Sequence, residues 1–281
     1  MNGAAEGFDV RRIVVALDAA SGTAESLEAA AEIAERLRAE LLALFVEDVN
    51  LLRSGELPFV RQVSVRSRIW RDFDAQSVER EMRASAAKAR HFLEAAAARR
   101  RVAHSFRVVR GHVAREVEAA AAEADLLIVE GTSRPLSPHV RLVSTTRGAA
   151  KAAVRSVFLL CPGVAGHNLV ALYDDAPGAD RALVAAASLA RRDGGALAIL
   201  VLAPTDDEMA ALEDRARRLL GRLGARAVYR PFAHATIDTL CAQARAAPDS
   251  LLVVSADSPL VEGPAAERLM DRVACPLLLV R

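Results

Sequence analysis

The sequence predicts an α/β protein made of two tandem five-stranded parallel-sheet sandwiches. Two observations carry this prediction. The segment 11–46 repeats without a gap at 167–202, and short apolar runs alternate with longer helical patterns in both copies. Because these runs are continuously apolar rather than alternating, they indicate parallel strands that are buried on both faces. The repeat superimposes Asp18 on Asp174, Gly22 on Gly178 and Leu27 on Leu183.

The repeat is too long for a solenoid unit and has the size of a small domain. A chain of 281 residues suffices for two domains that each bury a core. We place the first domain at 1–163 and a second, shorter one at 164–281. The boundary falls in a Pro- and Gly-containing turn, Pro162 to Asn168, between two uncharged apolar runs.

The first half has five expected strands and four expected helices. Ser21 and Thr23 are suitable N-caps for the first helix, and Arg36 and Arg38 suit its last turn. The expected strands are Ile13–Leu17, Leu41–Val46, Ser105–Val109, Leu126–Val129 and Val157–Leu160. The expected helices are Thr23–Arg38, Asp74–Arg99, Val113–Ala124 and Thr145–Ala153.

The second half follows the same alternation with shorter connections. Its expected strands are Leu169–Tyr173, Leu197–Leu202, Ala227–Arg230, Leu251–Val254 and Leu277–Val280. Its expected helices are Ala179–Arg192, Asp206–Leu223, Ile237–Ala246 and Ala265–Val273.

An inserted segment at 48–74 distinguishes the first half from the second. It contains Trp70, the single tryptophan of the chain, with Leu51, Leu52, Phe59 and Val60. A surface segment rich in large apolar residues usually covers another surface. Two interpretations stay open: a flap over its own domain, or a contact to the other half or to a second subunit.

Composition excludes several classes of function. Lys and Arg number 37 against 36 Asp and Glu, so no overall charge attracts nucleic acid or an anionic membrane. The run Arg99–Arg101 is typical of a helix end. Cys161, Cys241 and Cys275 have no paired spacing, which favours a reducing cytoplasm over a disulfide framework or a zinc site. We expect no signal peptide, and residues 156–173 form two strands and a turn rather than a membrane span.

Motifs of catalysis and metal binding are absent from the sequence. No P-loop, dinucleotide-binding glycine pattern or nucleophile elbow occurs, and the six histidines lack metal-ligand spacing. His112 is the histidine nearest the expected ligand-bearing edge, where a turn role is the alternative to a binding role. Asp174 and Asp175 are adjacent on a strand end, so their side chains should point apart. We therefore expect no catalytic residue, no metal site and no enzymatic activity.

Ligands of open parallel sheets bind beyond the carboxyl ends of the strands, at the point where strand order reverses. That rule selects Asp18 and Asp174 after the first strand of each half, and Gly131 and Ser255 after the fourth.

The opening IVVALD, the polar turn, the Ala-rich helix and the later EADLLIVEG make the chain resemble the universal stress protein family. The resemblance covers essentially the whole chain as two tandem domains. It implies a fold of the adenine nucleotide alpha hydrolase type, dimerisation through fifth strands, and a cytoplasmic stress-response role. Here the fifth strands Val157–Leu160 and Leu277–Val280 can pair within one chain, so a homodimer or another protein partner stays open. An electron-transfer-flavoprotein type of fold fits the length and the repeat poorly.

ATP-binding members of that family carry G-x2-G-x9-G-[ST] after the fourth strand, and an acidic residue after the first. The resemblance therefore implies an ATP site, with Mg²⁺, at Asp18, Gly131, Arg134, Ser144 and Thr145. Arg134 and Ser144 replace glycines whose backbone amides approach the phosphates. Arginine does not adopt positive φ as easily as glycine, although it supplies a charge to an anion.

The second half departs further from the pattern. The segment SADSPLVEGP after Leu251–Val254 is too short for the phosphate-loop spacing, and the paired carboxylates of Asp174 and Asp175 would repel a triphosphate. Two hypotheses result. One is a non-enzymatic interaction protein with reduced or lost nucleotide binding, and the other is an ATP-binding, slowly hydrolysing switch that uses the first domain.

Overall fold

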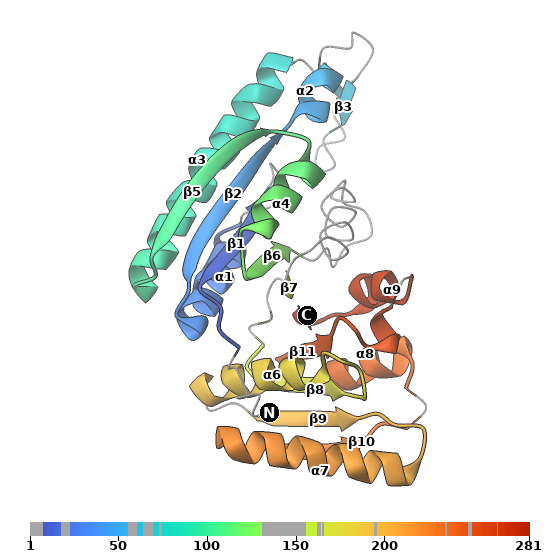
Figure 1. Cartoon of the computed structure of the whole chain (residues 1–281). Helices are drawn as coiled ribbons and strands as arrows, with labels where there is room; N and C mark the ends of the chain where they lie inside the picture. Colours follow the sequence, from blue (N-terminus) through green and yellow to red (C-terminus); the bar gives the residue numbers. More distant parts are fainter. Residues whose placement is uncertain are drawn as a thin grey trace.

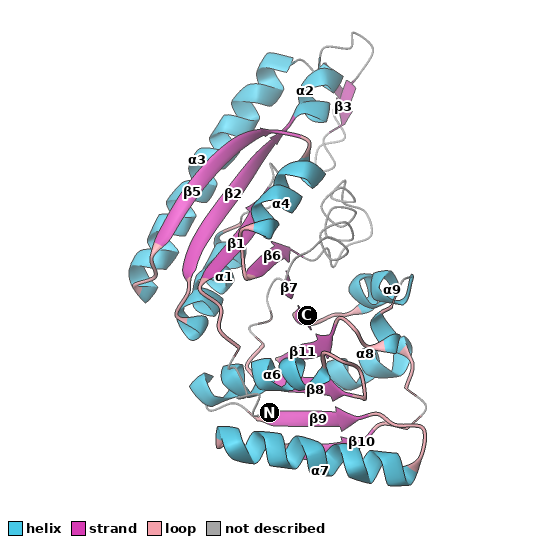
Figure 2. Ribbon diagram, in the orientation of Figure 1, coloured by secondary structure: helices cyan, strands magenta, loops and turns pink. Residues whose placement is uncertain are grey.

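A computed structural model describes residues 8–17, 23–55, 61–63, 70–72, 75–130, 156–161, 164, 166–193, 196–233, 235–246, 249–262 and 264–281. These residues form a ten-stranded sheet with helices on both faces, and a separate two-stranded ribbon (Figures 1 and 2). The α/β class predicted from the sequence is confirmed.

The first half supplies five strands to the sheet, each at its expected place to within two residues. The strands are β1 (Arg12–Leu17), β2 (Glu40–Asp48), β5 (His104–Gly111), β6 (Leu126–Glu130) and β7 (Ser156–Leu160). The described helices that pack on them are α1 (Ala24–Leu37), α3 (Ala75–Arg100) and α4 (Val113–Ala122). The helix expected at 145–153 lies outside the described residues.

The second half repeats the arrangement, and its helices α7 and α8 have the bounds expected from the sequence. The strands are β8 (Asn168–Tyr173), β9 (Leu197–Val201), β10 (Val228–Pro231), β11 (Ser250–Ser255) and β12 (Leu277–Val280). The helical elements are α6 (Ala179–Asp193), α7 (Asp206–Leu223), α8 (Ile237–Ala246), the 3₁₀ turn η1 (Pro259–Val261) and α9 (Pro264–Arg272).

The two five-stranded sets are joined into one sheet. Strand order is β10-β9-β8-β11-β12-β7-β6-β1-β2-β5, and neighbours are parallel within each half. At the centre β12 and β7 pair antiparallel, with Leu278 opposite Phe158 and Leu277 opposite Leu159. The pairing expected between the fifth strands of the two halves is therefore present, and it leaves neither strand as an open edge.

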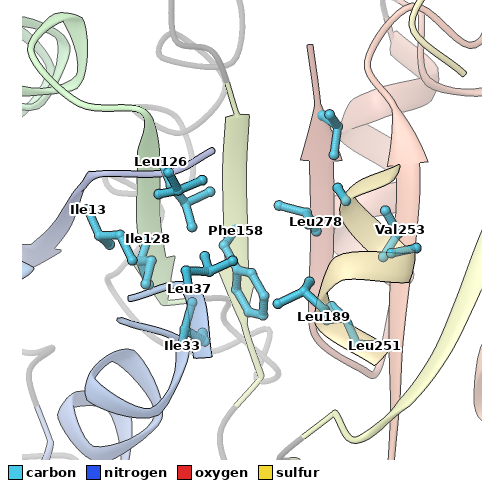
Figure 3. Close-up of a cluster of buried hydrophobic side chains, with 14 of the residues drawn as sticks. Ile13, Ile33, Leu37, Leu126, Ile128, Phe158, Leu189, Leu251, Val253 and Leu278 are labelled. Carbon is cyan, nitrogen blue, oxygen red and sulfur yellow. The ribbon is translucent and has the colours of Figure 1, made fainter. Parts of the chain in front are cut away.

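Continuous apolar strands build a core on each face of this sheet. Alternate residues point to opposite faces, so Ile13 and Val15 enter one core and Val14 and Ala16 enter the other. Helices α1, α3, α6 and α7 cover the first face, and α4, α8 and α9 cover the second. On the first face the core crosses the seam between the halves at Phe158 and Leu278 (Figure 3).

Side-chain caps define the starts of two helices. Thr23 caps α1 by accepting a hydrogen bond from the backbone N–H of Ser26, as its position in the sequence predicted. Thr205 caps α7 in the same way through the N–H of Glu208, while the Thr205 hydroxyl donates to the Glu208 carboxylate. Both bonds use the Thr205 hydroxyl, which accepts from the Glu208 backbone and donates to the Glu208 side chain. The other cap candidate, Ser21, lies outside the described residues.

The inserted segment contains elements that the sequence did not predict. Its described parts are the short helix α2 (Val49–Gly55) and the antiparallel ribbon of β3 (Arg61–Val63) and β4 (Trp70–Asp72). Helix α2 packs against α3 of the same half. This contact agrees with the flap interpretation, while a contact of the insertion to a second subunit stays a prediction.

Candidate functional site

The ligand site predicted for the first half centres on two neighbouring strand ends. β1 and β6 pair in parallel, with Val15 opposite Ile128, and they end at Leu17 and Glu130. Asp18 and Gly131 are the next residues in the sequence. Asp18, Gly131, Arg134, Ser144 and Thr145 lie outside the described residues, so this site stays a prediction.

The corresponding point in the second half is described. From β8 the chain proceeds through β9 to β10 on one side, whereas β11 leads to β12 on the other. Strand order therefore reverses between β8 and β11, which is where an open parallel sheet offers a ligand crevice. Two turns flank this point: Asp174–Gly178 after β8, and Ala256–Ser258 after β11.

A hydrogen bond joins these two turns. Oδ2 of Asp174 accepts from the hydroxyl of Ser258 at 2.5 Å, and Oδ1 of Asp174 accepts from the N–H of Ala176 at 3.1 Å. Asp174 is 5% exposed and Ser258 is fully buried. Both oxygens of the acidic side chain are thus engaged inside the protein. The sequence analysis did not single out Ser258. The pattern that could have identified it is a serine followed by a proline, shortly after a buried strand.

Gly178 lets the two turns touch. A Cβ at this position would lie 2.5 Å from Oγ of Ser255 and 2.7 Å from Oδ2 of Asp257. Real Cβ atoms do not approach so closely, so a larger residue here requires the side chains of Ser255 and Asp257 to shift. The repeat pairs Gly178 with Gly22, but the repeat alone did not reveal this packing role.

An acidic cleft of about 980 Å³ lies at these turns, and Asp174 and Asp257 are among its lining residues. The side chains of Leu202, Met209 and Leu212 contribute apolar surface to it. Among its described lining residues are five carboxylates and neither lysine nor arginine. The carboxylates belong to Asp174, Asp175, Asp206, Glu208 and Asp257. Such a lining repels a polyphosphate.

The neighbouring carboxylates of Asp174 and Asp175 point apart, as expected. Asp174 is buried, whereas the side chain of Asp175 is 89% exposed and lies 3.6 Å from Arg215. Arg215 also donates to Asp180 at 2.9 Å, and Asp180 accepts from the hydroxyl of Tyr173 at 2.6 Å. Burial, and then the bond to Asp180, raise the pKa of Tyr173. The phenol is therefore neutral at physiological pH and acts as a hydrogen-bond donor.

The helix that follows β11 is poorly suited to hold phosphate. Helix N-termini bind anions through free backbone N–H groups. Here α9 begins at Pro264, which has no N–H, and the carboxylate-bearing Glu262 lies just before it. The backbone oxygen of Glu262 already accepts from the N–H of Ala265 at 3.1 Å. The expected loss of the phosphate loop in this half agrees with that geometry.

Among the other described residues, we identify no further catalytic or metal-binding group. His112 occupies the N-cap position of α4, and its Nδ1 lies 3.4 Å from Nδ2 of Asn50. In the described part of the chain, no group of three or more His, Cys, Asp or Glu side chains is arranged to hold a metal. The helices described there include none that is long and apolar enough to cross a membrane.

No family model matches the sequence, and no curated protein matches it either. Solved structures do resemble the chain along its full length. A universal stress protein from Archaeoglobus fulgidus DSM 4304 aligns with a TM-score of 0.72 at 16% identity, covering 98% of this chain and 97% of its own. The chain has the universal stress protein fold.

Two further solved structures resemble the chain along most of its length. A putative universal stress protein from Pseudomonas aeruginosa UCBPP-PA14 aligns with a TM-score of 0.58 at 15% identity, covering 97% of this chain and 94% of its own. The cytoplasmic domain of a prokaryotic cation chloride cotransporter aligns with a TM-score of 0.52 at 13% identity, covering 96% and 94%. At these identities the likeness concerns the fold.

Proposed function

We propose that this chain is a cytoplasmic, non-enzymatic interaction protein of the universal stress type, in which the second half has lost nucleotide binding. The observation that carries the proposal is the hydrogen bond from Ser258 to Asp174. It joins the two turns between which a universal-stress-type ligand would enter, and it occupies the acidic side chain that would face that ligand. The carboxylate lining and Pro264 support the same conclusion.

The seam between the halves supports an intrachain pseudo-dimer. The family resemblance implies subunits that associate through fifth strands, and here β7 and β12 pair inside one chain. Because the core on one face continues across that seam, each half stabilises the other. In this proposal the degenerate half acts as a permanent structural partner for the first.

The alternative is an ATP-binding, slowly hydrolysing switch in the first half. One observation favours it: β1 and β6 are neighbours, so the residues after them, Asp18 and Gly131, follow the two strand ends at that half's own switch point. Gly131 and Thr145 match the family pattern, while Arg134 and Ser144 depart from it.

Thermal unfolding with millimolar ATP–Mg²⁺ tests the proposal. A ligand at 100 times its Kd adds about 2.7 kcal/mol to the free energy of unfolding, so binding raises the Tm. We expect no shift that depends on Asp174. A shift abolished by Asp174→Ala would contradict the proposal. One abolished by Asp18→Ala or Gly131→Trp but kept in Asp174→Ala would show the nucleotide site that the alternative requires in the first half.

A further inference from the structure

The two edge strands of the ten-stranded sheet differ in length and in proline content. One edge is β10, four residues long and ending at Pro231. The other is β5, eight residues long and without proline. Natural proteins protect exposed edges with short strands and prolines, because open edges pair with other chains. The β10 edge has that protection and the β5 edge does not (Figure 1).

The hydrogen-bond register shows which backbone groups of β5 face outward. The N–H of Leu41 donates to the carbonyl of Ala103, and Leu41 lies opposite His104. In a parallel pair, the N–H and C=O of one residue point to the same side and successive residues alternate. The odd-numbered residues of β5 therefore bond to β2, and the even-numbered residues present their N–H and C=O groups outward. These residues are His104, Phe106, Val108 and Arg110.

Exposed side chains accompany this open edge. Val108 is 42% exposed, one of the most exposed large apolar residues in the described chain. Phe106 lies on the α3 side under the guanidinium of Arg90, 5.0 Å from the ring centre. A strand added beside β5 would cover the apolar surface of Val108 and would pair with the outward backbone groups.

Strand β5 itself carries basic side chains and no acidic ones. Residues 99–115 contain six arginines and two histidines, but neither Asp nor Glu. Arg99 and Arg100 are paired with Glu28, and Arg110 is paired with Glu47 and Glu79. Arg107, on the strand itself, is exposed and has no ion-pair partner among the described residues. Its charge is therefore available to a docked chain.

We propose that β5 is a docking edge for an extended, acidic segment of another protein, which adds to the sheet as an eleventh strand. Backbone pairing gives such a complex its affinity, and side chains give it specificity. A second copy of this chain is a poor occupant, because antiparallel pairing centred on Arg107 would bring like charges together. The β5 edge is separate from the acidic cleft, so failure of this proposal would leave the proposed function standing.

A synthetic peptide of about eight alternating Val and Glu residues, capped at both ends, is a suitable probe. Its binding to the full chain is measured by calorimetry, and amide hydrogen exchange is followed by NMR. We expect binding that weakens with salt, and slowed exchange at the outward N–H groups of Phe106 and Val108. A peptide of alternating Val and Lys should not bind.

Three variants sharpen the test. Val108→Pro removes an outward N–H without breaking the β2 ladder and should abolish binding. Arg107→Glu should weaken binding about tenfold, whereas Arg230→Glu, the same charge change on β10, should leave it unchanged. If Val108→Pro fails to fold, the exchange measurement on the wild type decides.

Three results would overturn the proposal. One is the absence of peptide binding at millimolar concentration. The second is protection of Phe106 and Val108 without peptide, which would show that the chain itself or a second copy covers the edge; sedimentation separates those two cases. The third is binding that is equally weakened by Arg230→Glu and Arg107→Glu.

Discussion

Asp174 accepts a 2.5 Å hydrogen bond from Ser258, a residue 84 positions later in the chain. This contact joins the turn after β8 to the turn after β11, at the point where the strand order of the second half reverses. Both oxygens of this buried carboxylate accept hydrogen bonds from within the second half.

Removing the Ser258 hydroxyl should destabilise the second half. In Ser258→Ala one oxygen of the buried Asp174 carboxylate loses its donor, which costs about 1–3 kcal/mol of unfolding free energy. Urea denaturation measures the change. Ser188→Ala is the matched control, because the Ser188 hydroxyl donates to the Val184 carbonyl within the same helix, α6. Equal stability of both variants would show that the Asp174 contact contributes little.

Two glycine substitutions should have opposite effects. Gly178→Ala places a Cβ against Ser255 and Asp257 and should cost about 1–3 kcal/mol. Gly221→Ala lies in α7, where a new Cβ meets nothing within 4 Å, and should add about 0.5–1 kcal/mol through helix propensity. Thermal unfolding of the two variants measures both changes in stability. If Gly178→Ala left the stability unchanged, the two turns would not be in close contact.

The core shared across the seam, where β7 pairs with β12, should make the two halves unfold together. Phe158 is 3% exposed and lies opposite Leu278 of the other half. Phe158→Ala should cost about 3–5 kcal/mol, and hydrogen exchange should accelerate in both β1 and β8. Phe92→Ala removes a partly buried ring distant from the seam and is the control. Acceleration confined to β1 would contradict a shared core.

Asp249 should make stability depend on pH in the acid range. Partial burial acts to raise the pKa of Asp249, but hydrogen bonds from the His167 ring and from the N–H groups of Gly166 and His167 outweigh it and lower that pKa. Glu32 faces the other ring nitrogen of His167 at 3.6 Å. A lowered folded-state pKa gives stability that is full above the ordinary value of 3.8 and is lost as the pH falls through the folded value.

The test compares the wild type with Asp249→Asn, which keeps a side chain that tolerates the positive φ of 54°. The wild type should be the more stable of the two near pH 6, and the difference should shrink as the pH is lowered below about 4. A difference that stays constant over this range would exclude the charged form of Asp249 as its source.

Much of the fold was predictable because its strands are continuous apolar runs and its helices carry strong boundary signals. Thr205 with Glu208 marks the start of α7, and Gly224 marks its end in a left-handed conformation. The short elements α2, β3, β4 and η1 were not predicted, since so few residues carry no periodicity. The joined sheet was anticipated only through the pairing of Val157–Leu160 with Leu277–Val280.

The candidate site was less predictable. Asp174 was identified from its position after the first strand, and its separation from Asp175 follows from strand geometry. Its bond to Ser258 depends on tertiary contact between distant turns, which no local pattern encodes. The same is true of Arg215, which reaches Asp175 and Asp180 from α7.

The most direct test of the central claim is mass analysis of the small molecules released when freshly purified protein is denatured, before and after incubation with ATP–Mg²⁺. The engaged Asp174 carboxylate and the acidic lining predict that no adenine nucleotide is released from the second half, so Asp174→Ala should release the same amount as the wild type. About one nucleotide per chain that disappears in Asp174→Ala, but persists in Asp18→Ala, would contradict the claim.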